Sequence, residues 1–108
     1  MNEDYRDILQ ALVAEHARFL IVGAHALALH GYPRSTVDID IWIDATEDID
    51  ILTAVSGLTF ERAWANRVDD VIEGVRVPVL GLADLIANKT AAGRDKDRAD
   101  VKGVKGKN

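Results

Sequence analysis

The segment STVDIDIWID (residues 35–44) places Asp38 and Asp40 two residues apart in a run that otherwise alternates like a β-strand. Carboxylates at positions i and i+2 of a strand share a face, with Cα atoms roughly 6.5–7 Å apart. Side chains at this separation can converge on one hard cation, and oxygen ligands suit Mg²⁺. Because charged groups are costly to bury unless they are paired or hold a metal, the pattern predicts a metal site.

A third carboxylate, Asp50, lies in the next predicted strand, IDILT (residues 49–53). If residues 36–43 and 49–53 pair antiparallel with Asp40 opposite Asp50, all the isoleucines fall on one face and the three carboxylates on the other. Metal sites for phosphoryl or nucleotidyl transfer usually need such a third carboxylate. The alternative is an exposed sheet face with scattered aspartates, although Asp is a poor strand residue.

A strand, a glycine turn and a helix follow one another in RFLIVG (residues 18–23) and AHALALHG (residues 24–31). The first N–H groups of such a helix form a natural anion site. The small Ala24 after Gly23 would let a triphosphate approach the backbone closely. Since strand–glycine–helix turns are common in α/β proteins, an ordinary connection is the alternative.

The remaining elements are predicted by hydrophobic periodicity and by turn residues. Helices are expected at residues 4–17, within 57–67, at 82–93 and from about Asp95, and two strands within 68–80 should fold back at Glu73–Gly74. This order predicts a small α+β (α/β-like) domain, a mixed β-sheet flanked by helices. We expect one domain over residues 1–101 and a basic, mobile tail over residues 102–108.

Composition narrows the function classes. The 108 residues include no cysteine, which excludes a disulfide framework or thiolate metal site, and the net charge of −5 argues against general nucleic-acid binding. The opening MNEDYRD is not a signal peptide, and the longest apolar stretch is too short to span a membrane, so we expect a cytoplasmic protein without membrane contact. Open sheet edges favour a homodimer.

A family resemblance rests on FLIVGAHALALHGYPRSTVDIDIWID (residues 19–44). It resembles the minimal nucleotidyltransferases of the DNA polymerase β-like superfamily, in the antitoxin/AbiEii-like branch and in shortened form. Their signature is an apolar strand, Gly, then Gly or Ser, a spacer, and Asp–apolar–Asp. The similarity continues in IDILTAVSGLTFERAWANR, GVRVPVLGLADLIANK and KTAAGRDKDRADV, and so covers nearly the whole chain.

The resemblance implies roles for individual residues. Asp38 and Asp40 would be metal ligands, and Asp50 would be the third carboxylate, which helps to activate an acceptor hydroxyl. Gly23 and Ala24 would lie beside the triphosphate.

The resemblance also implies a reaction and its participants. The enzyme would move a nucleoside monophosphate from an NTP, with ATP favoured, to a hydroxyl group, using Mg²⁺ or Mn²⁺. The acceptor is expected to be a hydroxyl group on a partner protein, such as the cognate toxin of a toxin–antitoxin pair.

Basic residues could position the phosphates. The resemblance places Lys89 near the nucleotide, and Arg34, Arg94 and Lys96 are further candidates. Asp97 and Asp100 lie one helical turn apart, so they share a face and could orient Lys89 or Arg94 through salt bridges. The alternatives are that Arg34 is an ordinary surface arginine and that residues 93–100 belong to an ordinary charged helix.

The histidines and aromatic residues are expected mainly to pack in the fold and not to take part in chemistry. His25 and His30 have a poor metal-binding spacing and are expected to pack or to line a pocket edge. Trp42 could stack on a base or pack on the sheet, and Phe60 and Trp64 are expected in the core.

Two departures from the family pattern favour a second interpretation. Ala24 replaces the usual Gly or Ser, and only DATED (residues 44–48) separates the two aspartate strands, where relatives carry a substantial segment. A non-catalytic interaction module or antitoxin that keeps the fold is therefore the main alternative. A nuclease with an acidic metal site is a third, which explains the strand–glycine–helix junction less well.

Overall fold

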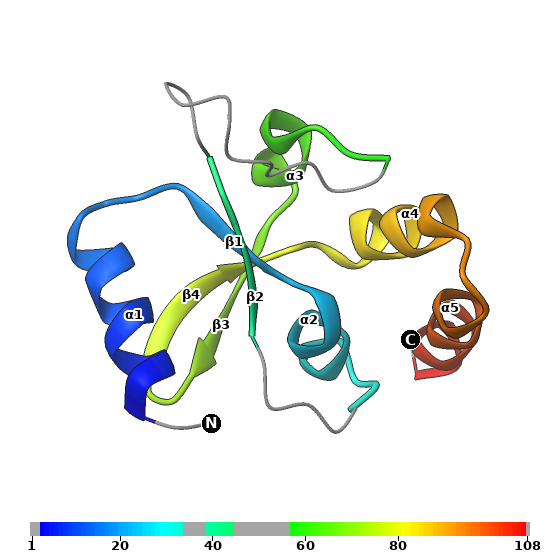
Figure 1. Ribbon diagram of the computed structural model, residues 1–108, viewed down its shortest axis with the longest axis horizontal. Coiled ribbons are helices and arrows are strands. Elements are labelled where there is room, and N and C mark those ends of the chain that lie inside the picture. Colours follow the sequence, from blue (N-terminus) through cyan, green and yellow to red (C-terminus); the bar gives the residue numbers. More distant parts are fainter. Residues whose placement is uncertain (1–2, 34–38, 45–56, 108) are drawn as a thin grey trace.

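The computed structural model describes residues 3–33, 39–44 and 57–107, and within them the chain forms a four-stranded mixed β-sheet flanked by five helices (Figure 1). This architecture confirms the predicted fold class and is compatible with a nucleotidyltransferase core. The elements are α1 (Glu3–Ala14), β1 (Phe19–Val22), α2 (Gly23–Leu29), β2 (Asp40–Ile43), α3 (Phe60–Ala65), β3 (Val68–Ile72), β4 (Val75–Val79), α4 (Leu82–Ala92) and α5 (Asp95–Lys107).

The strands are ordered β2-β1-β4-β3. β1 pairs antiparallel with β2 and parallel with β4, while β3 and β4 form an antiparallel hairpin. Glu73 and Gly74 close this hairpin with φ angles of 51° and 78°, the left-handed values that a two-residue type I′ turn needs. The predicted turn position is therefore confirmed.

The core is centred on β1, whose first three residues, Phe19, Leu20 and Ile21, are at most 1% exposed. Consecutive buried residues are typical of a strand that is covered on both faces. Helices supply that cover: α1 contacts β4, and α2 contacts β1 and β2. In Figure 1, α1 lies to the left of the strands, and α2, α4 and α5 lie to the right.

Helix α1 ends in a Schellman motif. The Ala17 N–H donates to the Leu12 carbonyl at 3.0 Å, and the His16 N–H donates to the Val13 carbonyl at 3.1 Å. His16 therefore occupies the left-handed position at which glycine is favoured, and its φ is 55°. This geometry turns the chain from α1 into β1 within four residues.

Helix α5 is longer than predicted. It continues to Lys107, so the boundary expected after residue 101 falls inside a helix. Val104, which is 1% exposed, packs the helix against the core. Gly103 lies against the Tyr32 ring, with no room for a Cβ atom. Tertiary contacts therefore extend a helix whose Lys/Gly composition suggested a tail.

Strand β2 also differs from its predicted pattern. Trp42 is 5% exposed and Ile43 is 40% exposed, so the more deeply buried side chain is on the aspartate face and not on the isoleucine face. The reason is α3, where the Phe60 ring meets the Trp42 ring edge-on with centroids 5.1 Å apart. The expected strand at 49–53, and its pairing with residues 36–43, lie outside the described residues.

No helix within the described residues is long and apolar enough to cross a membrane.

Candidate functional site

The strand–glycine–helix junction forms as predicted, with β1 running directly into α2 at Gly23. Gly23 has a φ of 69°, a left-handed value that costs other residues about 1–2 kcal/mol. The preceding N-cap residue, Val22, makes no side-chain hydrogen bond to the helix. The glycine therefore allows a strand to become a helix without an intervening loop.

Asp40 lies directly beside this glycine. The antiparallel register pairs Val22 with Asp40, and a Cβ added to Gly23 would clash with the Asp40 Oδ2 atom. Glycine is thus required twice here, by its backbone angle and by the closeness of the carboxylate. The structure brings together two residues that lie seventeen positions apart in the sequence, one from each half of the predicted motif.

The Asp40 carboxylate is open to solvent and makes no hydrogen bond or ion pair with another described residue. An exposed carboxylate beside a backbone that carries no side chain suits a hard cation and an anionic ligand bound to it. Ala24, which follows Gly23, adds only a methyl group and no polar side chain at this position.

Three predicted site residues, Arg34, Asp38 and Asp50, lie outside the described residues. Across residues 3–33, 39–44 and 57–107, no three His, Asp or Glu side chains come together as a metal site. The donor of the proposed site that can be placed is Asp40, whose carboxylate oxygens are the type that Mg²⁺ prefers.

The predicted salt bridges between the last two helices are present. Lys89 Nζ on α4 lies 3.3 Å from Asp97 Oδ1 and 3.3 Å from Asp100 Oδ2 on α5. The Arg94 Nε atom donates to Asp97 Oδ2 at 2.7 Å, and the Arg94 backbone N–H donates to the same oxygen at 3.2 Å. We call these four residues the Lys89–Asp97 cluster. Its spacing on α5 was visible in the sequence, and its geometry confirms the expectation.

Most of the Lys89–Asp97 cluster is buried. The Asp97 side chain is 0% exposed and the Asp100 side chain 3%, while Lys89 is 11% and Arg94 is 59% exposed. The hydrogen bond from Arg94 lowers the pKa of Asp97 to about 2, against burial, which raises it; Lys89 also lowers it. The same hydrogen bond raises the pKa of Arg94. The cluster is therefore a salt-bridged link between α4 and α5.

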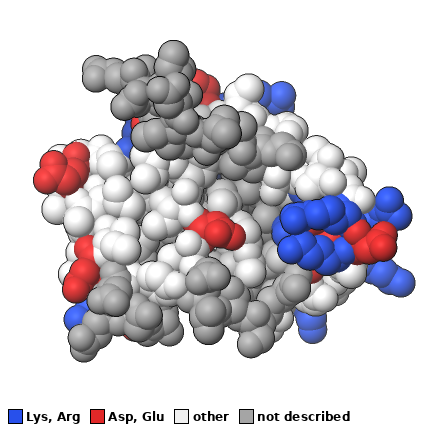
Figure 2. Space-filling model, viewed as in Figure 1, with Lys and Arg blue, Asp and Glu red and all other residues white. Residues whose placement is uncertain are grey.

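The basic residues differ in what they can offer a ligand. Lys89 is held by two buried carboxylates, whereas Arg94 and Lys96 are exposed. Figure 2 shows Lys and Arg side chains gathered around a few acidic ones on the side of the molecule where α5 lies in Figure 1. Helix α2, which begins at Gly23, contacts both β2, which carries Asp40, and α4, which carries Lys89.

His25 lies on α2, and His30 is the C-cap residue of this helix. His30 Nε2 donates to the Leu80 carbonyl at 2.7 Å and so ties the end of α2 to the chain that leaves β4. His25 Nδ1 is buried without a hydrogen-bond partner among the described residues. Trp42 is packed against Phe60 and is not free to stack on a base.

The fold and the Gly23–Asp40 junction are compatible with a nucleotidyltransferase. A sequence model described as "Nucleotidyltransferase of unknown function (DUF6036)" matches residues 3–105, and the chain belongs to this family. No curated protein matches the chain. The family label supports transfer of nucleotidyl groups in general and does not specify a branch, metal or acceptor.

Proposed function

We propose that this chain is a metal-dependent nucleotidyltransferase that moves a nucleoside monophosphate from an NTP, with ATP favoured, to an acceptor hydroxyl. The observation that carries the proposal is the exposed Asp40 carboxylate beside Gly23, in a chain whose family is described as nucleotidyltransferase. The signature glycine followed by Asp–apolar–Asp further supports a place in the DNA polymerase β-like superfamily.

In this proposal Asp38 and Asp40 hold Mg²⁺ or Mn²⁺, and Asp50 is the third carboxylate. When bound, the metal would polarise the α-phosphate and stabilise the charge of the departing pyrophosphate. Asp50 assists the attacking hydroxyl. Gly23 and Ala24 leave the backbone accessible to the triphosphate, because neither carries a side chain longer than a methyl group.

The basic residues bind the phosphates in this proposal. Arg94 and Lys96 have the necessary exposure, and Arg34 precedes the aspartate strand. Lys89 acts from a more buried position, where Asp97 and Asp100 hold its ammonium group in one place. A cation with fixed orientation costs less entropy when the nucleotide binds.

The acceptor is proposed to be a partner protein, such as a cognate toxin, because the sequence resembles the antitoxin branch of this superfamily. A homodimer is also proposed, since β2 and β3 are the outer strands of the sheet that the described residues form. Light scattering coupled to size-exclusion chromatography tests the dimer directly.

A non-catalytic antitoxin or interaction module is the second candidate. The observation that favours it is the five-residue link DATED between the two aspartate strands. A shorter link removes chain that could have enclosed the nucleotide. This candidate predicts partner binding without nucleotide turnover.

Calorimetric titration of the four NTPs, with and without Mg²⁺, tests the metal–nucleotide site. We expect Mg²⁺-dependent binding that Asp40→Asn abolishes. Asp7→Asn is the matched control, because it removes the same charge from an exposed position on α1. Failure of the folded wild-type chain to bind any NTP with Mg²⁺ would contradict the enzyme and favour the interaction module.

Label transfer then separates nucleotidyl transfer from other reactions. The wild-type chain is incubated with a candidate partner and with ATP labelled at either the α- or the γ-phosphate. Nucleotidyl transfer moves the α-label to the acceptor and releases the γ-label in pyrophosphate. Transfer of the γ-label would instead show a phosphotransferase.

A further inference from the structure

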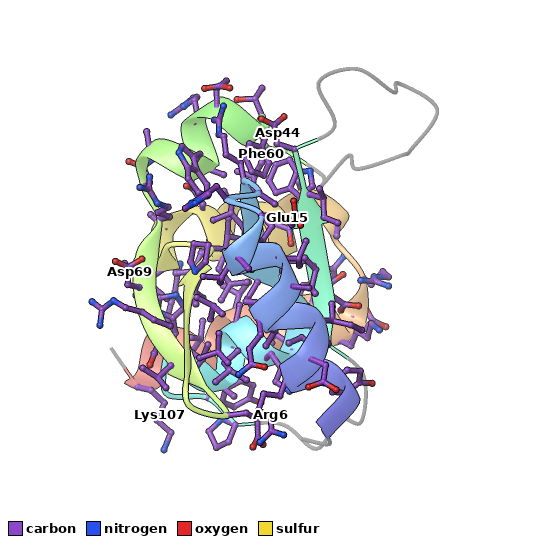
Figure 3. All side chains as sticks on the ribbon, turned by 90° about the vertical axis from the view of Figure 1, so that its left-hand side faces the viewer. Arg6, Glu15, Asp44, Phe60, Asp69 and Lys107 are labelled. Carbon is purple, nitrogen blue, oxygen red and sulfur yellow. The ribbon has the colours of Figure 1, made fainter. Side chains whose placement is uncertain are left out.

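A pocket lies at the opposite end of β1 from Gly23 and Asp40. It has a volume of about 390 Å³, within the range of small-molecule sites. The end of α1, the start of β1, the end of α3 and the β3–β4 hairpin line it. Figure 3 views the molecule from the side of α1, with Phe60 beside Asp44 near the top and Asp69 on the outer hairpin.

The pocket is positively charged in a chain whose net charge is −5. Its lining includes Arg18, Arg67 and Arg76, against one described acidic residue, Asp69. Its apolar lining includes Val13 and Pro78, with the buried Phe19 and Val77, each 1% exposed, beneath the surface. Cations around an apolar floor are the arrangement expected for an organic anion.

Arg67 is oriented before any ligand arrives. Its guanidinium carbon lies 3.9 Å from the centre of the Trp64 ring, and its Nη1 atom donates to the Trp64 carbonyl at 2.8 Å. The Trp64 ring is itself stacked on Phe60, with centroids 5.8 Å apart. Arg67 forms no ion pair with an acidic residue in the described part of the chain. Its charge and one planar face are therefore available.

The other two arginines differ in how firmly they are paired. Arg18 is held by Asp44 at 3.2 Å and Glu61 at 3.0 Å, so its charge is largely balanced. Arg76 lies 3.8 Å from Asp69, and the two side chains are 75% and 53% exposed. Exposed pairs of this kind contribute little, so a stronger anion could displace Asp69.

We propose that this pocket binds a phosphate monoester with a planar or apolar body, a nucleoside monophosphate being the simplest example. A phosphate monoester carries about −1.5 to −2 charges at neutral pH, which matches the charges of Arg67, which forms no ion pair with a described acidic residue, and Arg76, whose ion pair is exposed. The guanidinium forks of Arg67 and Arg76 can each bind phosphate oxygens bidentately. The body of the ligand would lie on the apolar floor or stack on Arg67.

Calorimetric titration with AMP in the presence of EDTA tests the proposal apart from the metal-dependent site. We expect Arg67→Gln and Arg76→Gln each to weaken binding about tenfold or more, as loss of a charged hydrogen-bond donor does. Arg62→Gln is the matched control, since it removes the same charge from an exposed position on α3 that does not line the pocket. Asp40→Asn should bind AMP like the wild type.

Four results would overturn the proposal. The first is that the folded wild-type chain does not bind AMP, and the second is that Arg62→Gln weakens AMP binding as much as Arg67→Gln or Arg76→Gln. The third and fourth are that adenosine or benzoate binds as tightly as AMP. Adenosine lacks the phosphate, and benzoate carries a carboxylate on a planar body. Because Arg76 is mostly exposed, Arg76→Gln keeps the test valid if Arg67→Gln does not fold. These outcomes are measured in EDTA and so do not depend on whether the chain binds an NTP with Mg²⁺.

Discussion

The ion pairs that the buried Asp97 forms with the largely exposed Arg94 and with Lys89 allow a quantitative prediction of how stability varies with pH. Asp97→Asn keeps the shape of the side chain and removes its charge, so Lys89 loses one of its two carboxylate partners. Removing one partner of a buried ion pair destabilises a protein more than replacing both partners with apolar residues does, because the remaining charge stays buried without a partner. We therefore expect the variant to be less stable at pH 7.

The magnitude follows from the pKa of Asp97, which falls from the ordinary 3.8 to about 2 in the folded chain. A change of this size corresponds to about 2 kcal/mol of pH-dependent stability. Solvent screens part of it, because the Arg94 side chain is 59% exposed, and we expect about 1–2 kcal/mol. Since the folded pKa is lowered, this contribution is present above about pH 4 and disappears as pH falls toward 2.

Urea unfolding, followed by tryptophan fluorescence at a series of pH values, measures this difference. The gap in unfolding free energy between wild type and Asp97→Asn should narrow by about 1–2 kcal/mol between pH 5 and pH 2. Asp95→Asn is the matched control on the same helix, because the Asp95 side chain is fully exposed, and it should leave the midpoint nearly unchanged. A gap that does not vary with pH, or an equal effect of Asp95→Asn, would refute the reasoning.

Three further predictions concern the backbone and α5. Gly23→Ala should destabilise the fold by at least about 1–2 kcal/mol and abolish Mg²⁺–NTP binding, because φ is positive and the new Cβ meets Asp40; urea unfolding and calorimetry measure both. His16→Gly should raise the unfolding free energy by up to about 1 kcal/mol, since glycine is favoured at this left-handed position. Deleting residues 102–108 should lower the melting temperature, because it removes the buried Val104.

Each of these has a contrary outcome. Gly106→Ala is the control for Gly23→Ala, because a Cβ at Gly106 meets nothing within 4 Å; equal losses in the two variants would disprove the steric argument. A lower stability of His16→Gly would show that the histidine side chain contributes more than its backbone strain costs. An unchanged melting temperature after deletion would mean that residues 102–108 are indeed a tail.

Local sequence signals were sufficient for most of the elements. The Glu73–Gly74 turn, the end of α4 at Gly93 and the direct passage from β1 to α2 were all predicted, because each depends on residues that are adjacent in the chain. The pairing of α4 with α5 through Asp97 and Asp100 was also predicted, because helical geometry places residues three apart on one face.

Contacts between distant segments were not readable in the same way. Alternation in β2 predicted buried isoleucines, but packing of α3 against the sheet buries Trp42 and leaves Ile43 40% exposed. Likewise, the low hydrophobicity of the last residues gave no sign that Val104 is buried. Periodicity describes which side chains share a face, and only the neighbouring elements decide which face is covered.

By itself, then, the sequence determined the kinds of elements, their turns and the residue types of a carboxylate site, since these depend on local propensity and spacing. The tertiary structure decided that Asp40 lies beside Gly23, through the antiparallel register of β1 and β2. It also decided that Arg67 and Arg76 share a pocket, through the β3–β4 hairpin and the end of α3. Gly23 and Asp40 lie seventeen positions apart in the chain, and Arg67 and Arg76 lie nine apart. Pairing of neighbouring strands brings each pair together, and strand register depends on the burial of whole faces.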